Sequence, residues 1–382
     1  MKKIVIIPDS FKGTMSSIEV CEIIENAIKN ILPEAEVIKI PVADGGEGTV
    51  DAFIKAMGGE KVFTKVKGPL FTNINAFYGI LSDGKTAVIE MAAASGLPLA
   101  GEDKNPCKAT TYGTGQLISA ALDRGYRKII IGLGGSATND AGIGAASALG
   151  VKFLDDAGKE VSLNGEGLEK IARIDTSGLD KRVLECEIVV ACDVANPLYG
   201  PDGAAHIFAP QKGADIKMVE YLDKNLMHYA EIIKKEFEID LQSIAGTGAA
   251  GGLGASLIVF AKAVLQPGIR IILDCVKFDE VIKDADLIIT GEGKIDGQSL
   301  NGKVPIGVAD RALKQKIPVI AVVGDIGDDI ELVYDRGISA VFSINRQAIP
   351  FEKAKLRCKT DLKETVESLI RFAKVLKTQR DD

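Results

Sequence analysis

The chain opens with a short apolar run that is followed by a helical spacing of apolar residues. Residues 4–7 are apolar and end at a Pro-Asp-Ser turn, after which residues 17–31 place apolar side chains three or four positions apart. That spacing puts them on one face of a helix. A second apolar run at 37–40 leads through a glycine-rich turn to a helical pattern at 50–57, which ends at Gly58, a typical residue just past a helix. The pattern predicts two successive units of a strand and a helix.

The same alternation of strands and helices returns near the C-terminus. Neither end of the chain carries enough strands for a stable sheet alone, but together they supply a five-stranded parallel sheet. We therefore expect an α/β fold with a flavodoxin- or Rossmann-like, doubly wound parallel sheet. This domain is discontinuous, comprising residues 1–70 and 285–382, and a large inserted α/β domain occupies residues 71–284. The C-terminal strands are expected at 287–290, 319–323 and 340–343, and the C-terminal helices at 305–314 and 329–336.

The inserted segment carries its own alternation of apolar runs and helical patterns. Residues 217–236 have the spacing of an amphipathic helix, and a second such helix with a charged tail is expected from about residue 360. Strands of the insertion are expected at 87–90, 128–131, 188–191 and 269–273.

Composition narrows the class of protein. The 46 basic and 53 acidic residues give a net charge of -7 without any basic block, so a nucleic-acid partner is not expected. No apolar stretch approaches the roughly 18 to 20 residues that cross a bilayer, and the first apolar run is too short for a signal peptide. The six cysteines lack the close pairs of zinc or redox motifs. We expect a cytoplasmic protein with free thiols and no membrane partner.

Four glycine-bearing loops lie beside predicted strands and helices. They are DSFKGT from Asp9, ADGGEGT from Ala43, GLGGSATND from Gly132 and GTGAAGGLG from Gly246. Each loop is either a tight turn or a loop whose backbone N–H groups bind anionic oxygens at a helix N-terminus. A single loop does not distinguish the two, but four in one chain favour phosphate binding.

The loop at Gly132 admits a rival interpretation. Gly132, Gly134 and Ala137 fit the G-x-G-x-x-A dinucleotide pattern, with Asp155 and Asp156 at a suitable distance downstream. An NAD-dependent oxidoreductase is therefore the alternative function. Against it, the only histidines are His206 and His228, and neither lies in a motif of a hydride-transfer site.

Acidic residues follow the predicted strands, at the edge where doubly wound sheets bind ligands. Carboxylates beside phosphate loops suit magnesium, and with histidine so scarce a carboxylate is also the expected general base. Lys12 and Lys303 precede predicted helices, where each would direct a cation at a bound anion. The acidic residues are Asp9, Asp44, Glu47, Asp193, Glu292, Asp296 and Asp325.

Seven strings in the chain together resemble one enzyme family. They are DSFKGTMSS, PVADGGEGT, TYGTGQLI, GLGGSATNDAG, CDVANPLYGP, GTGAAGGLG and TGEGKIDGQSLNGKVP. These strings are similar to those of the type-one glycerate kinases, and the likeness runs from Met1 to about Val341. The resemblance implies ATP-dependent phosphorylation of D-glycerate, generally at the 2-hydroxyl, by a flavodoxin-like part with an inserted domain.

With that activity expected, chemistry and position suggest roles for the candidate residues, with ATP and Mg²⁺ as cofactors and a site in the cleft between the two domains. The glycine loops would cradle the ATP phosphates, Lys12 and Lys303 would neutralise oxygens, and Asp44 or Asp296 would accept the hydroxyl proton. A monomer or a homodimer is expected. The cofactor-binding candidates are Gly134, Gly135, Ser136, Thr138, Asn139, Gly251 and Gly252; the substrate-binding candidates Ser10, Lys12, Asp44 and Glu47; the catalytic candidates Asp44, Asp296, Lys12 and Lys303; and the magnesium ligands Asp193 and Asp296.

Overall fold

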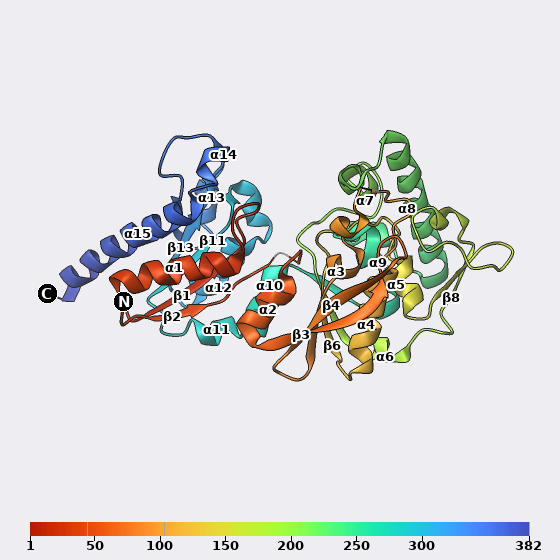
Figure 1. Ribbon diagram of the computed structural model, residues 1–382, viewed down its shortest axis with the longest axis horizontal. Helices are drawn as coiled ribbons and strands as arrows, with labels where there is room; N and C mark the ends of the chain where they lie inside the picture. The colour runs from red at the N-terminus through yellow and green to blue at the C-terminus, as the bar shows by residue number, and fades with distance from the viewer. Residues whose placement is uncertain (44, 103, 382) are drawn as a thin grey trace. The chain divides into compact units, whose positions relative to one another are not determined.

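The computed structural model describes residues 1–43, 45–102 and 104–381, and within them the side chains of Asn301 and of residues 376–381 are left out of the description. The chain forms two compact units (Figure 1). Unit 1 comprises Met1–Ala43, Lys55–Met57 and Ile269–Asp382, and unit 2 comprises Asp44–Ile54 and Gly58–Gly268. Unit 1 is therefore built from both ends of the chain.

Unit 1 contains the five-stranded parallel sheet that the sequence predicts. The strand order is β15-β13-β11-β1-β2, with Ile4 of β1 opposite Leu287 of β11 and Val37 of β2. Numbered along the chain this order reads 2-1-3-4-5, which is the flavodoxin type. The strands are β1 (Lys3–Pro8), β2 (Glu36–Lys39), β11 (Leu287–Gly291), β13 (Val319–Val323) and β15 (Ile338–Ser343).

Helices cover both faces of this sheet, which makes it doubly wound. α1 (Ser17–Ile31) and α15 (Cys358–Asp381) lie side by side in Figure 1 and pack with Ile4 and Ile6 of β1 in one core. α12 (Val304–Lys314) contacts β11, β13 and β15. Ser16 caps α1 through a reciprocal capping box with Glu19, which fixes the end of the loop after β1. At the C-terminal ends of the strands, loops form the edge of the sheet.

Unit 2 is built on a six-stranded mixed sheet in the order β10-β9-β6-β5-β4-β3. The predicted strands at 87–90, 128–131 and 188–191 are confirmed as β5, β6 and β9, which pair in parallel. The antiparallel hairpin of β3 and β4 was not predicted. The strands are β3 (Gly59–Lys67), β4 (Asn73–Leu81), β5 (Thr86–Glu90), β6 (Lys128–Gly132), β9 (Glu187–Ala191) and β10 (Val264–Gln266).

The expected strand at 269–273 is wrong, because these residues belong to the helix α10 (Gly268–Cys275). The strand of this region is β10, which ends just before Pro267. A run of five mostly apolar residues does not separate a buried strand from one buried turn of helix. The chain passes from one compact unit to the other within residues 43–58 and again at residue 268. The domain boundaries predicted at 70 and 285 stay predictions.

The remaining helices of unit 2 surround its sheet. The amphipathic helix predicted at 217–236 is confirmed as α8 (Ile216–Phe237), whose first turn is capped by Asp215. Among the described residues no helix is both long and apolar enough to cross a membrane. The other elements of unit 2 are α2 (Thr49–Met57, whose last three residues count with unit 1), α3 (Ala92–Ser95), α4 (Tyr112–Asp123), α5 (Ile143–Ala148), α6 (Lys181–Leu184), α7 (Ala204–Phe208), α9 (Leu253–Ala261), β7 (Lys152–Leu154) and β8 (Arg173–Asp175). The other elements of unit 1 are α11 (Phe278–Val281), α13 (Glu331–Tyr334), α14 (Phe351–Ala354), β12 (Lys294–Ile295) and β14 (Asp325–Ile326).

Candidate active site

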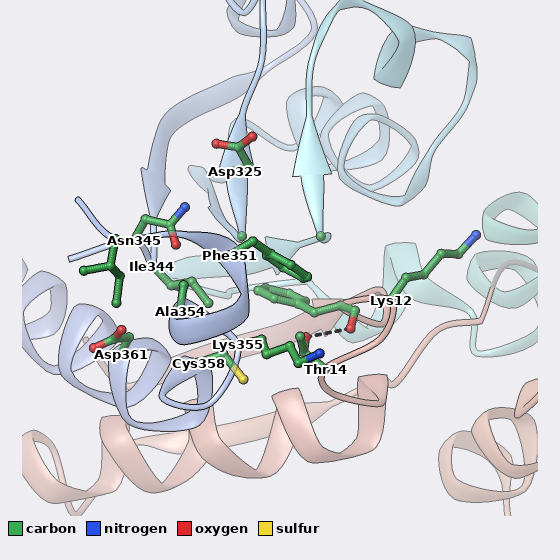
Figure 2. Close-up of a pocket in the computed structure, with 14 residues that line it drawn as sticks. Lys12, Thr14, Asp325, Ile344, Asn345, Phe351, Ala354, Lys355, Cys358 and Asp361 are labelled. Carbon is green, nitrogen blue, oxygen red and sulfur yellow. Dashed lines mark hydrogen bonds between the residues drawn. The ribbon is translucent and has the colours of Figure 1, made fainter. Parts of the chain in front are cut away.

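A pocket of about 230 Å³ lies beyond the C-terminal ends of the strands of unit 1. Its walls come from the loops after β1, β11, β13 and β15 and from α14 and α15 (Figure 2). Phe11 is buried in the wall, whereas Phe351 is 64% exposed. Lys12 lines the same pocket, and its side chain extends away from the Phe351 ring in Figure 2. This is the edge where flavodoxin-like sheets bind ligands.

A buried carboxylate and a lysine are paired at the same sheet edge. Glu292, directly after β11, is nearly inaccessible, and its Oε1 accepts a hydrogen bond from the Ser299 hydroxyl at 2.8 Å. Its Oε2 lies 3.4 Å from Nζ of Lys303, the residue that caps α12 ahead of Pro305 in the first turn. Burial raises the pKa of Glu292, and Lys303 opposes that shift. Lys303 is thus paired with Glu292, one of the acidic residues that follow the predicted strands, although the sequence did not indicate this pairing.

Asp296, expected as base or metal ligand, also takes part in a local turn. Its Oδ1 accepts the amide N–H of Gln298 at 3.0 Å, which caps the short 3₁₀ helix Gly297–Asn301, and its Oδ2 lies 3.7 Å from Nζ of Lys294. In the loop after β1, the amide of Ser10 donates to Oδ1 of Asp9 at 2.6 Å. Ser10, Lys12, Asp296 and Lys303 therefore all lie in unit 1.

In unit 2 the loops that contain DGGEGT and GLGGSATND pack directly against each other. The amide of Gly134 donates to the carbonyl of Gly45 at 2.9 Å. A Cβ atom on Gly132 would lie 2.3 Å from that carbonyl oxygen, and one on Gly134 would lie 2.4 Å from Cα of Gly46. The Gly134 amide thus makes its hydrogen bond within the protein, and its expected role in cradling phosphate stays a prediction. Gly135 and Glu47 remain exposed in these loops.

The GTGAAGGLG loop packs against the other end of GLGGSATND. The amide of Ala141 donates to Gly251 O at 2.9 Å, and the hydroxyl of Thr138 donates to Ala250 O at 3.2 Å. Gly251 has φ +67°, and a Cβ there would lie 2.0 Å from Thr138 O. Thr138, Gly251 and its neighbour Gly252 are buried. Tight packing between two loops explains these glycines, and the expected cofactor-binding role of the three residues stays a prediction.

A lysine that the sequence did not single out is buried under the GLGGSATND loop. Lys212 is 2% exposed, and its Nζ donates to Ser136 Oγ and to Thr138 O, each at 2.7 Å. Burial lowers the pKa of Lys212 to about 7, and the negative charge of Asp140 acts in the opposite direction. The available signal was its setting in FAPQKGA, where a single charge stands among small and apolar residues.

Two further polar groups of this loop are fully buried. The carboxylate of Asp140 accepts hydrogen bonds from the hydroxyl and amide of Thr111, both at 2.8 Å, and from the amides of Gly142 and Gly144. Burial raises the pKa of Asp140, and these four donors oppose the shift. Asn139 is completely buried, and neither atom of its side-chain amide has a partner among the described residues. The loop therefore concentrates polar groups inside unit 2.

The structure places the predicted site residues in two groups. Asp193 belongs to unit 2, where its Oδ1 accepts the amide of Gly268 at 2.9 Å. Asp44 lies outside the described residues. The residues brought together in unit 1 are Ser10, Lys12, Asp296 and Lys303, and those in unit 2 are Glu47, Gly134, Gly135, Ser136, Thr138, Asn139, Asp193, Gly251 and Gly252.

The comparison with protein families agrees with the motifs of both units. A family model described as the glycerate kinase family matches residues 4–374. The chain belongs to the glycerate kinase family. A glycerate 2-kinase from Escherichia coli (strain K12) is 52% identical over 343 residues, covering 90% of each chain. A glycerate kinase from Bacillus subtilis (strain 168) is 48% identical over 377 residues, covering 98% of this chain and 99% of the relative.

A solved structure shows that this family shares the fold. A crystal structure from Salmonella typhimurium LT2, provisionally assigned as a glycerate kinase 2, matches with a TM-score of 0.87 and 46% sequence identity over 99% of both chains. A mixed α/β fold with parallel sheets is thus common to both proteins.

The oxidoreductase alternative finds no support in the family or in the geometry. After Gly132 the chain does not enter a helix until α5 begins at Ile143, whereas the dinucleotide pattern needs its glycines at the helix N-terminus. Asp155, which lies at a suitable distance downstream for that pattern, accepts the amides of Ala157 and Lys159 at 3.0 and 2.8 Å and so closes a turn.

Proposed function

We propose that this protein is an ATP-dependent kinase that transfers the γ-phosphoryl group of ATP to D-glycerate and forms 2-phospho-D-glycerate. The observation that carries the proposal is the family match across residues 4–374. Two relatives that align over 90% or more of this chain are named glycerate kinase and glycerate 2-kinase. The six free thiols are consistent with a cytoplasmic location, and a monomer or a homodimer stays part of the proposal.

The pocket of unit 1 is the proposed place for the adenine base. Its volume of about 230 Å³ suits a flat heterocycle, and Phe11 and Phe351 offer aromatic surface beside it. Asp325 and Asn345 add polar groups that could orient the base. Lys12, on the wall of the same pocket, would then neutralise an oxygen of the attached phosphates.

The residues present fit magnesium that arrives with the nucleotide rather than a metal held by the protein alone. Within the described ranges, no group of three or more His, Cys, Asp or Glu side chains is placed to hold a metal ion. Magnesium needs only one or two protein carboxylates when phosphate oxygens and water complete its shell. Asp193 or Asp296 stays the proposed ligand, and the bound ion would supply neutralisation of phosphate charge.

The groups proposed for catalysis are charged and sit at the sheet edge of unit 1. Phosphoryl transfer depends mainly on positioning and on neutralising negative charge, and Lys303, held by Glu292, is placed to supply a cation. Asp296 is a proposed general base. Asp44, the other candidate, lies outside the described residues. Ser136 and Gly135 stay the proposed contacts of the glycine loop to an anionic oxygen.

The proposal is tested by following ADP release from purified protein with ATP, Mg²⁺ and D-glycerate. Phosphorus NMR of the product separates 2-phosphoglycerate from 3-phosphoglycerate, and L-glycerate serves as the stereochemical control. We expect turnover with D-glycerate, preference over L-glycerate, and the 2-phosphate as product. Absence of ADP release with glycerate, hydroxypyruvate and tartronate would overturn the kinase assignment, and accumulation of the 3-phosphate would overturn the regiochemistry alone.

A further inference from the structure

We propose that Lys212 is a positioning residue that turns the hydroxyl of Ser136 outward, so that this hydroxyl donates a hydrogen bond to an anionic oxygen of a reactant. The inference rests on the proposed function, since it assigns a role within the same kinase site. The ligand chemistry is an oxyanion, which is supplied either by a phosphate of ATP or by the carboxylate of glycerate.

The geometry under the loop is rigid. Lys212 ends the short 3₁₀ helix Pro210–Lys212, and its Nζ reaches Ser136 Oγ and Thr138 O at 2.7 Å each. The loop itself is anchored on both sides of Ser136. The carbonyl of Gly135 accepts the amide of Leu97 at 2.8 Å, and the amide of Ala137 donates to Ser95 O at 2.9 Å.

The donor inventory of an ammonium group fixes the direction of the hydrogen bond. A protonated lysine has three N–H donors and no acceptor. In the contact with Lys212, Ser136 Oγ must therefore be the acceptor. The hydroxyl hydrogen of Ser136 is then directed elsewhere. Ser136 is 8% exposed and is preceded in the chain by the exposed Gly135, so an anion on this side of the loop is a suitable acceptor.

Deprotonation of Lys212 changes that direction. A neutral amine keeps two N–H donors and gains one lone pair. One donor still serves Thr138 O, which is only an acceptor, and the lone pair can accept the hydroxyl hydrogen of Ser136. Ser136 would then donate inward and offer an incoming anion only oxygen lone pairs. The charge on Lys212 thus decides whether the loop attracts or repels the oxyanion.

The surroundings of Lys212 keep its protonation equilibrium near neutral pH. Burial lowers the pKa of Lys212 to about 7, while Asp140, in the loop between β6 and α5, favours the charged form. On the other side Gly213 packs against the backbone of Lys104, which is an exposed residue. An anion bound at Ser136 adds negative charge nearby and so favours the protonated lysine.

The sign of the pH effect follows from the charge. Lys212 is protonated and Ser136 points outward below the folded-state pKa of about 7. As pH rises through that value, the outward donor is lost. We therefore expect kcat/KM of the wild-type enzyme to carry a limb that falls with increasing pH, in addition to any limb from the general base.

The experiment compares four proteins: wild type, Lys212→Met, Ser136→Ala and the double variant. Removing the outward hydrogen bond to a charged oxygen should lower kcat/KM about 10- to 100-fold in each single variant. The double variant should fall no further, because both changes remove one interaction. The falling limb near pH 7 should be absent from all three variants. Lys217→Met, an exposed lysine at the start of α8, is the matched control and should retain wild-type kinetics.

The two sources of the oxyanion are separated by the Michaelis constants. A selective rise in KM for ATP assigns the anion to a phosphate, and a selective rise in KM for glycerate assigns it to the carboxylate. Thermal melting checks the fold, and Met at a fully buried position removes a buried charge without adding a polar group. Should Lys212→Met fail to fold, the pH profile of Ser136→Ala carries the test, since that variant leaves Lys212 in place.

Three results would overturn the inference: kcat/KM of Lys212→Met within a few-fold of wild type, additive losses in the double variant, or a falling limb that persists in Ser136→Ala. A wild-type enzyme that does not phosphorylate glycerate fails the proposed function instead, so the two failures are distinguishable.

Discussion

The two units present their candidate groups in different ways. In unit 1 the groups are charged side chains at the sheet edge: Lys303 is 42% exposed and pairs with the buried Glu292, and Lys12 lines an open pocket. In unit 2 the groups belong to loops that pack on one another, and Lys212 and Asp140 are buried among them. A charge at the edge of unit 1 can change without moving the backbone, whereas a change in the loops of unit 2 displaces a neighbouring loop.

This difference between the units predicts which variants lose activity and which lose stability. Removing a partly exposed charge costs little folding free energy but removes transition-state neutralisation. Adding a single carbon where two backbones touch costs folding free energy whatever the chemistry of the site. If the comparison holds, variants of unit 1 lose rate while melting normally, and glycine variants of unit 2 lose stability first.

The largest effect is expected for Lys303→Ala. One electrostatic contact to the transition state is worth roughly 3 to 4 kcal/mol, so kcat should fall about 100- to 1000-fold. The pKa of Glu292 should rise further, because its neighbouring cation is gone. Steady-state kinetics measure the fall in kcat, and thermal melting checks that the variant is folded. Lys314→Ala, an exposed lysine in the last turn of α12, is the control and should behave like wild type. A normal kcat in Lys303→Ala would remove this lysine from the mechanism.

An intermediate effect is expected for Gly134→Ala in unit 2. The new Cβ would lie 2.4 Å from Cα of Gly46, so the loops must separate, at a cost of about 1 to 3 kcal/mol in the free energy of unfolding. Urea denaturation measures the change. Gly254→Ala is the matched control, because its Cβ would meet Leu265 at an ordinary 3.4 Å inside α9. Equal stability of the two variants would show that the loops do not interlock as described.

The smallest effect is expected for Phe351→Ala in the pocket of unit 1. Loss of one aromatic contact to the base should raise KM for ATP roughly 2- to 10-fold and leave KM for glycerate unchanged. The control is Phe372→Ala on α15, since Phe372 is 65% exposed, as Phe351 is 64% exposed, but does not line the pocket. An unchanged KM for ATP, in an enzyme that phosphorylates glycerate, would move the adenine site elsewhere and leave the kinase assignment intact.

Most of the fold of unit 1 could be predicted from the sequence because its elements are long and strongly periodic. The strand Ile4–Ile7 and the helix Ser17–Ile31 were placed almost residue for residue. The segment 269–273 was misassigned, because one turn of a buried helix and one buried strand have the same apolar composition. The hairpin of β3 and β4 was missed although Gly68-Pro69, a typical turn dipeptide, lies between its two strands.

The sequence by itself determined the family and the residue types of the candidate site, since the glycine loops, the carboxylates and the lysines can be recognised in short sequence motifs. Only the tertiary structure decided which of these groups are accessible. Gly134 and Thr138 stand in one string with Ser136, yet contacts with residues far along the chain occupy the first two. Lys212 lies 76 positions from Ser136 and still donates to its hydroxyl. Burial and hydrogen bonding depend on which segments the fold brings together. The spacing of residues within one short string does not indicate which distant segments those are.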